Sequence, residues 1–151
     1  MQNKPVALVT GANKGIGLQI AKDLAAHGFT VLIGSCNLEH GETAAKSVGA
    51  DASVLQLDVT NQPSIAAAAE RIRNEVGRLD VLVNNAGVSQ AGKPGRPLQE
   101  IAKSGRASVA SLNFQDTRTV QQAAREPVRL ALLDANGPTG TFSNEDGLRP
   151  W

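Results

Sequence analysis

Three closely spaced glycines, Gly11, Gly15 and Gly17, form the pattern in this chain that points most directly to chemistry. They stand between an apolar run and an amphipathic segment, where a loop must turn sharply and bring its backbone close to a bound group. Glycine meets both demands because it has no Cβ. The helix that follows offers free N–H groups and a partial positive charge to phosphate oxygens. The sequence therefore predicts a nucleotide pyrophosphate site, with a purely structural turn as the alternative.

The elements that must position this loop alternate regularly along the first part of the chain. Short apolar runs predict strands at 6–10, 29–33, 53–57 and 79–83, and residues 15–27, 38–48 and 60–76 predict helices. Gly28, Gly49 and Gly77 stand where helices end, and Thr60 or Asn61 is suited to cap the third helix. Short connections and right-handed crossovers predict an α/β fold, a Rossmann-like open parallel sheet between two helical layers.

The later part of the chain is less regular, so the predicted fold is incomplete. Residues 1–151 are expected to form a single domain, with 4–92 as an intact cofactor half, 93–116 irregular apart from a short helix at 98–103, and 117–151 as a C-terminal remnant. In that remnant, 119–133 predicts a helix that Pro127 should kink or divide, and 140–143 predicts a short last strand.

Bulk composition excludes several classes of function. The formal charge is +1 and basic residues are scattered, which argues against a nucleic-acid or membrane-surface partner. No run approaches the roughly 18 apolar residues of a membrane span, and no leader segment is recognisable. A single cysteine fits a reducing, cytoplasmic location. No cluster has metal-ligand spacing, and His27 and His40 are expected at the surface, away from the carboxyl ends of the strands.

Three separate segments carry a resemblance to a known family. Thr10 to Gly17, Asp58-Val59 and Asn84 to Gly87 resemble the short-chain dehydrogenase/reductase family, and the form of the glycine loop is similar to that of its carbonyl reductases. The resemblance implies that the pyrophosphate and adenosine ribose are held by Gly11, Asn13, Lys14, Gly15, Ile16 and Gly17. It implies that Asp58 and Val59 flank the adenine and that Asn85, Ala86 and Gly87 lie by the nicotinamide ribose. The alternatives are a helix-start cap or a solvated loop residue for Asp58, and a sheet-bracing loop for 84–87.

Cofactor choice is argued from charge. An NAD site needs a carboxylate at the end of the second strand, but Gly34-Ser35-Cys36-Asn37 contains none, and Lys14 adds a cation suited to a 2′-phosphate. NADP is therefore predicted over NAD. Cys36 stands where NADP-dependent members of the family often place an arginine, and a guanidinium is the stronger phosphate partner. Preference for NADP is therefore expected to be weakened.

The residues that would complete the family's chemistry are missing. The chain contains no tyrosine, so the Tyr-x-x-x-Lys signature cannot occur, and neither the serine motif nor the asparagine-bearing helix is recognisable. The segments 117–133 and 137–142 resemble the family's last helix and strand, which implies an absent interior joined between Pro97 and Asn113. A divergent module that keeps both ends is the alternative. No catalytic residue is assigned.

Three functions remain open from the sequence. The first is a protein that by family is an NADP-dependent carbonyl oxidoreductase, with a small carbonyl substrate, but is catalytically impaired. The second is a non-catalytic nucleotide-binding or interaction protein that pairs with a full-length relative. The third is an enzyme with an unfamiliar acid. Without further strands the fourth strand is an exposed edge, which the last strand, a second copy or another chain would have to cover.

Overall fold

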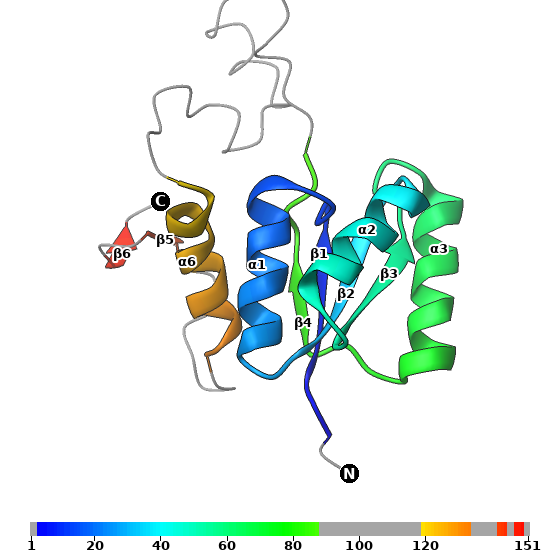
Figure 1. The fold of residues 1–151 in the computed structure, drawn as a ribbon, viewed down its shortest axis with the longest axis horizontal. Helices are drawn as coiled ribbons and strands as arrows, with labels where there is room; N and C mark the ends of the chain where they lie inside the picture. Colours follow the sequence, from blue (N-terminus) through cyan, green and yellow to red (C-terminus); the bar gives the residue numbers. More distant parts are fainter. Residues whose placement is uncertain (1–2, 88–118, 134–141, 145–146, 150–151) are drawn as a thin grey trace, which may run out of the picture.

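The computed structural model describes residues 3–87, 119–133, 142–144 and 147–149. Its first part contains β1 (Val6–Thr10), α1 (Gly15–Ala26), β2 (Thr30–Ser35), α2 (Leu38–Val48), β3 (Ala52–Gln56), α3 (Gln62–Arg71), the π-helical segment η1 (Ile72–Val76) and β4 (Val81–Val83). Its last part contains α6 (Val120–Ala131), β5 (Phe142–Asn144) and β6 (Gly147–Arg149). Figure 1 shows these elements along the chain.

β1 to β4 form one parallel sheet in the order β3-β2-β1-β4. Val9 of β1 is in register with Ile33 of β2 and with Val83 of β4. Strand type, order along the chain and parallel pairing confirm the prediction of a Rossmann-like fold. Strand bounds shift by one or two residues, and β4 begins at Val81 rather than at residue 79.

The sheet is covered on both faces, as the continuous apolar runs require. On one face α1, α2 and α6 enclose a core that includes Val9, Ile20, Leu24, Val31 and Ile33. On the other face α3 packs through Ala68 against a smaller cluster, which comprises Val6, Leu8, Leu32, Leu55 and Leu57. Phe29 is the one aromatic residue among the buried hydrophobic residues of the described chain, so aliphatic side chains supply nearly all of this core.

α6 brings the end of the chain back onto its beginning. It lies beside α1 (Figure 1), where Ala124 and Val128 are buried in the main core. Thr119 begins the helix with a capping box, in which Thr119 Oγ1 accepts from Gln122 N and Gln122 Oε1 accepts from Thr119 N. Pro127 lies inside α6, which continues as one element, so the helix is not divided there.

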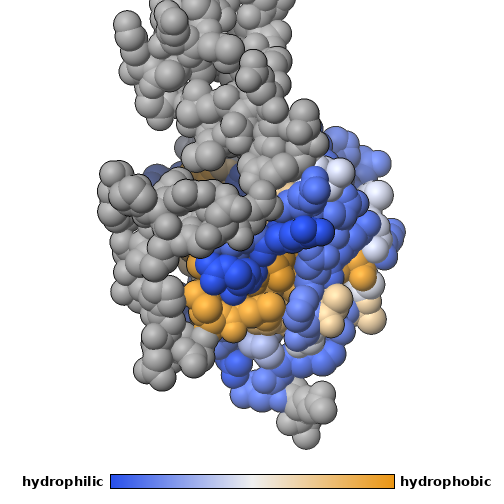
Figure 2. Space-filling view, turned by 90° about the vertical axis from the view of Figure 1, so that its left-hand side faces the viewer, coloured by the Kyte–Doolittle hydropathy of each residue, from blue (hydrophilic) through white to orange (hydrophobic). Residues whose placement is uncertain are grey.

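Exposed apolar side chains lie on β4, which is an edge strand of the sheet, and near the end of α6. Leu82 of β4 is 52% exposed, and Leu130 and Leu132 near the end of α6 are also exposed. Figure 2, which views the molecule from the side on which α6 lies in Figure 1, shows apolar residues gathered beside hydrophilic ones.

Two predictions about element ends are corrected, and one is confirmed. The third helix is not one α-helix to residue 76, because it passes into the π-helical η1 before Gly77 stops it at φ +80°. Its cap is Asn61, one of the two predicted candidates, whose Oδ1 accepts from Ser64 N at 3.0 Å. The last strand lies at 142–144 and pairs antiparallel with β6, so it does not cover β4. The predicted irregular segment 93–116 and short helix 98–103 lie outside the described residues.

Asp80 ties the start of β4 to the start of β1. Its Oδ2 accepts from Val6 N at 2.7 Å and from Arg78 Nε at 2.8 Å. These two interactions, the bond from Val6 first, hold the pKa of Asp80 below its ordinary value.

A pH dependence of stability follows from this lowered pKa. A carboxyl group whose pKa is lower in the folded state stabilises the fold above its unfolded pKa of about 3.9, and that contribution disappears as pH falls through the folded value. Asp80→Asn is therefore expected to lower stability at neutral pH and to flatten its decline below about pH 4. Urea unfolding from pH 3 to pH 7 measures this, with Asp23→Asn on α1 as control. Parallel pH profiles for the parent chain and Asp80→Asn would contradict the assignment.

Candidate cofactor-binding site

The carboxyl ends of β1 to β4 meet at one edge of the sheet, as parallel strands require. The loops that leave this edge and the first turn of α1 carry all twelve predicted site residues: Gly11, Asn13, Lys14, Gly15, Ile16 and Gly17 after β1, Cys36 after β2, Asp58 and Val59 after β3, and Asn85, Ala86 and Gly87 after β4. In open α/β sheets, ligands bind in the crevice outside this edge. The fold therefore gathers the predicted residues where a ligand would lie.

The glycine loop is tightly packed against the loop that follows β4. A Cβ on Gly11, which has φ +62°, would lie 2.9 Å from Ala86 Cα. A Cβ on Gly17 would collide with Asn85 Nδ2 and would lie 2.7 Å from Gly11 O. Both glycines are thus required by close approach between backbone segments, whereas a Cβ on Gly15, also at φ +62°, meets nothing within 4 Å.

Thr10, Asn85 and Ala86 form a hydrogen-bonded clasp between the ends of β1 and β4. Thr10 Oγ1 accepts from Asn85 N at 3.0 Å and from Ala86 N at 2.9 Å, and it donates to Val83 O at 3.4 Å. Asn85 Nδ2 donates to Thr10 O at 3.0 Å and to Gly11 O at 3.2 Å. The side-chain amide of Asn85 is therefore used to hold the glycine loop in place.

The role of Thr10 is one that sequence reasoning missed. Thr10 is 3% exposed and ends a buried strand, and the sequence pattern predicts it as part of that strand without a role for its hydroxyl. The available signal was a hydroxyl residue directly before the glycine loop, where a strand end leaves backbone groups to be paired. The alternative expectation was that segment 84–87 braces the sheet. The side chain of Asn85 acts in this way, because it bonds the backbone at the end of β1.

The clasp makes a prediction about stability. Thr10→Val keeps the size of the side chain but leaves the N–H group of Ala86 without its acceptor and that of Asn85 with Val83 O at 3.0 Å as its remaining acceptor. We expect the free energy of unfolding to fall by about 1–3 kcal/mol, because each buried unpaired N–H carries a desolvation penalty. Thr10→Ser, which keeps the hydroxyl, should lose less than about 1 kcal/mol. Urea unfolding of the two variants measures the difference, and equal losses would rule out the hydroxyl as the cause.

The N-terminus of α1 is open to an anion. Its cap residue, Lys14, is extended at φ −162° and ψ 170°, makes no side-chain capping bond and is exposed. No acidic residue lies in the first turn of the helix. The first N–H groups of a helix have no intrahelical partner and carry a partial positive charge. Gly15, Ile16 and Gly17 therefore present backbone donors at the place where a phosphate group would be held.

The end of β2 is uncharged, as predicted. Ser35 Oγ donates to Asn37 O at 2.7 Å, and Asn37 caps α2 by accepting from His40 N at 2.9 Å. Cys36 between them is exposed and free. Ala12 N donates to Gly34 O at 3.0 Å, which holds the glycine loop beside this strand end. A 2′-phosphate placed here would meet no fixed negative charge from these strand-end residues.

Asp58 organises the turn between β3 and α3. Its Oδ1 accepts from Thr60 Oγ1 at 2.6 Å and from Thr60 N at 2.9 Å, and these bonds lower the pKa of Asp58. The alternative of a helix-start cap is wrong for Asp58, because the cap of α3 is Asn61. Val59 beside Asp58 is 43% exposed, which leaves an apolar surface at the edge of the site.

The two histidines lie in different places. His27 follows α1 at the opposite edge of the sheet, as expected, with Nδ1 2.7 Å from Asp23 O. His40 is exposed, as expected, but it does not lie away from the carboxyl ends of the strands, because α2 starts at that edge and His40 lies in its first turn, on the β2 side. Within residues 3–87, 119–133 and the two short strands, no group of three or more His, Cys, Asp or Glu side chains is placed to bind a metal. None of the described helices has the length and hydropathy to cross a membrane.

Comparison with solved structures finds the same fold in oxidoreductases. Menthone neomenthol reductase from Mentha piperita aligns with a TM-score of 0.55 at 41% identity, covering 57% of this chain and 32% of that one. A metagenomic short-chain oxidoreductase in complex with NADP aligns with a TM-score of 0.55 at 31% identity, covering 84% and 57%. The 3-ketoacyl-(acyl-carrier-protein) reductase from Brucella melitensis complexed with NADH aligns with a TM-score of 0.55 at 29% identity, covering 74% and 48%.

Relatives found by sequence are also reductases, and this chain matches only part of the length of each. It is 48% identical over 86 residues to the 3-oxoacyl-(acyl-carrier-protein) reductase FabG of Escherichia coli (strain K12), which covers 56% of this chain and 35% of that protein. It is 47% identical over 90 residues to (-)-isopiperitenone reductase of Mentha piperita, covering 55% and 29%. The chain thus spans about a third of the length of these curated relatives. The family model for short chain dehydrogenase matches residues 5–129, and the chain belongs to that family.

Proposed function

We propose that this chain binds a nicotinamide dinucleotide at the carboxyl edge of its sheet and prefers NADP(H) to NAD(H). The observation that carries the proposal is the interlocked geometry of two loops: Gly11 and Gly17 lie against Ala86 and Asn85 so closely that no side chain fits between them. This arrangement holds the uncapped N-terminus of α1 open toward the crevice. Two of the structural neighbours are complexes with NADP or NADH, which supports the class of ligand.

The residues of the site divide naturally along a bound dinucleotide. The glycine loop with Asn13, Lys14 and Ile16 would hold the pyrophosphate and the adenosine ribose. Asp58 and Val59 would border the adenine, and Asn85, Ala86 and Gly87 would lie by the nicotinamide ribose. The cofactor supplies hydride when bound, and the residues named here bind and orient it.

The proposed role is binding without efficient carbonyl reduction, in a cytoplasmic protein. Membership of the family suggests the oxidation or reduction of a small carbonyl compound as the reaction. The chain, however, contains no tyrosine to act as the family's proton donor. Titration of the purified chain with NADPH and with NADH, followed by nicotinamide fluorescence, tests the proposal. Saturable binding, with NADPH bound more tightly than NADH, supports the proposal. Failure of both cofactors to reach saturation refutes it.

Two substitutions test the argument for NADP in opposite directions. Lys14→Gln removes the cation beside the expected 2′-phosphate, and we expect about tenfold weaker NADPH binding with little change for NADH. Cys36→Arg places a guanidinium at the end of β2, and we expect about tenfold tighter NADPH binding. Lys22→Gln on the exposed side of α1 is the matched control. Equal effects of Lys14→Gln on the two cofactors would show that Lys14 does not contact the 2′-phosphate.

A further inference from the structure

The hydrogen-bond donors at the β4 end of the cofactor site are already used within the chain. The side-chain amide of Asn85 carries two N–H groups, and it donates to Thr10 O at 3.0 Å and to Gly11 O at 3.2 Å. The backbone N–H of Asn85 has Thr10 Oγ1 and Val83 O as acceptors, each at 3.0 Å, and that of Ala86 has Thr10 Oγ1 at 2.9 Å. The carboxamide oxygen of a nicotinamide would therefore find no free N–H group on Asn85 or Ala86.

Close packing keeps these two residues in this arrangement. A Cβ on Gly17 would collide with Asn85 Nδ2, so the amide is held against the start of α1. Ala86 Cα lies 2.9 Å from the place where a Cβ on Gly11 would stand. Turning the Asn85 amide toward the crevice would break both of its hydrogen bonds to the glycine loop, which carries the desolvation penalty of unpaired groups. The nicotinamide end of the site therefore gains no donor from a rotation of this side chain.

The start of α1, by contrast, keeps its donors. The first hydrogen bond of this helix runs from Leu18 N to Lys14 O at 3.4 Å, and the N–H groups of Gly15, Ile16 and Gly17 precede it. Such groups have no acceptor within the helix and carry the positive end of its dipole. Hydrogen bonds to an ionised phosphate are roughly twice as strong as bonds between neutral groups. We therefore expect the strongest contacts of a bound dinucleotide at its pyrophosphate.

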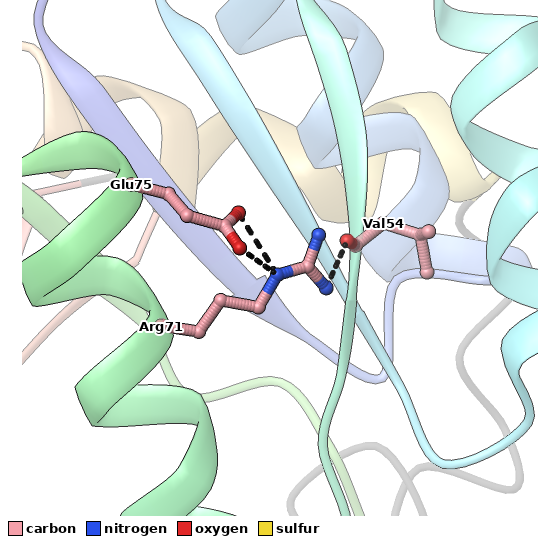
Figure 3. A network of polar contacts seen from close by, with 3 residues as sticks. All are labelled: Val54, Arg71 and Glu75. Carbon is pink, nitrogen blue, oxygen red and sulfur yellow. Dashed lines mark hydrogen bonds and ion pairs between the residues drawn. The ribbon is translucent and has the colours of Figure 1, made fainter.

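Lys14 is the one Lys or Arg in the described loops that leave the carboxyl edge of the sheet. It is exposed and forms no ion pair within the described part of the chain. Arg71, at the end of α3, is engaged elsewhere. Its Nε donates to both carboxylate oxygens of Glu75, at 3.0 and 2.9 Å, and its Nη1 donates to Val54 O at 3.3 Å (Figure 3). Lys14 is therefore the basic group that these loops offer to a 2′-phosphate.

We propose that this site recognises the 2′-phospho-ADP portion of its ligand and does not recognise the nicotinamide. Its ligands are then a class, the 2′-phosphorylated derivatives of ADP-ribose, which includes NADPH, NADP⁺ and the nicotinamide-free 2′-phospho-ADP-ribose. The inference rests on the dinucleotide binding proposed above and names the part of the ligand that supplies the affinity. A nicotinamide lies beside the β4 loop without a donor from Asn85 or Ala86, so its oxidation or its removal changes the affinity little.

Isothermal titration calorimetry of the full chain with parts of the ligand tests the inference. We expect the dissociation constants of NADPH, NADP⁺ and 2′-phospho-ADP-ribose to agree within about fivefold, which is the effect of one ordinary neutral hydrogen bond. Prior saturation with 2′-phospho-ADP-ribose should abolish the heat of NADPH binding. Nicotinamide mononucleotide, the other part of the ligand, should show no binding at concentrations at which NADPH saturates the chain.

The outcomes separate this inference from the proposed function. Saturable binding of NADPH, with 2′-phospho-ADP-ribose bound more than about fivefold more weakly, overturns the inference and leaves the proposed function standing. Absence of binding by every nucleotide overturns both.

A substitution at Lys14 provides a second measurement. Lys14→Gln should weaken binding of NADPH and of 2′-phospho-ADP-ribose by the same factor, about tenfold, because both carry the 2′-phosphate. Lys22→Gln, on the exposed side of α1, should change neither affinity. A loss of affinity confined to NADPH would show that the nicotinamide-free nucleotide binds elsewhere, and it would overturn the inference.

Discussion

Replacing Gly17 with alanine is expected to abolish measurable binding of NADPH and NADH. The added Cβ collides with Asn85 Nδ2 and lies 2.7 Å from Gly11 O and 3.1 Å from Ala12 Cα. Two of these three atoms belong to the backbone of the glycine loop, so the loop and the start of α1 must separate. Displacement of binding groups by about 1 Å is enough for a loss of about 10²-fold, and we expect at least that loss of affinity.

The same substitution should also destabilise the fold, which gives a second measurement. Overpacking of a tight contact costs about 1–3 kcal/mol, and here it also strains the clasp through Asn85. Gly49→Ala is the matched control, because Gly49 has φ +128°, an added Cβ there would meet nothing within 4 Å, and the residue lies at the opposite edge of the sheet. This control should lower stability but leave cofactor affinity unchanged. Normal NADPH affinity in Gly17→Ala would show that the close approach is not needed for binding.

Much of the fold could be predicted because, in the N-terminal half, the apolar runs, helix ends and glycines all indicate the same elements. Val6–Thr10 and Thr30–Ser35 are almost wholly buried, and such strands read as continuous apolar runs. Gly28, Gly49 and Gly77 all have positive φ, so the glycines that ended the predicted helices do so in the structure. Each of these features depends on a few neighbouring residues, which is why a single sequence predicts them.

The features that could not be predicted depend on residues far apart in the chain. The fit between Gly17 and Asn85 joins two loops after different strands, and no local pattern shows that the Asn85 amide bonds Thr10 O and Gly11 O. The pairing of β5 with β6 is local by contrast, and it is missed because the sequence pattern predicts no strand at 147–149. The π-helical end of α3 is a local deviation, and its residues Ile72 and Val76 still pack against the second core cluster.

Cofactor binding and carbonyl reduction place different demands on this chain. The described residues include the glycine loop and the β4 loop, and Thr10, Gly11, Gly17, Asn85 and Ala86 interlock through direct contacts with one another. A site that is already assembled loses little conformational freedom when its ligand binds. The proposed binding of a dinucleotide therefore depends on residues that this chain contains, whereas proton transfer to a carbonyl oxygen needs a further, positioned acid.

We expect the isolated chain to reduce aldehydes and ketones more slowly than its full-length relatives by about 10²–10⁴-fold or more. A positioned general acid contributes about that factor, and the family's donor is a tyrosine hydroxyl, a residue absent from this sequence. The described histidines do not replace it. His27 lies at the opposite edge of the sheet, and His40 lies in α2 beside β2, separated by β1 from the β4 loop where the nicotinamide is proposed.

The measurement is NADPH consumption with a panel of aldehydes and ketones, using chain that has been shown to bind NADPH. The 3-oxoacyl-(acyl-carrier-protein) reductase of Escherichia coli, assayed with its own substrate, is the positive control. Gly17→Ala, purified in the same way, reports turnover by contaminating reductases, because this variant should not bind the cofactor. Turnover that approaches the control and disappears in Gly17→Ala would show that this chain supplies its own acid. Slow turnover with intact binding would instead indicate that the function of this chain is to hold the dinucleotide. Proximity to the bound hydride would then be the one catalytic contribution that the chain makes.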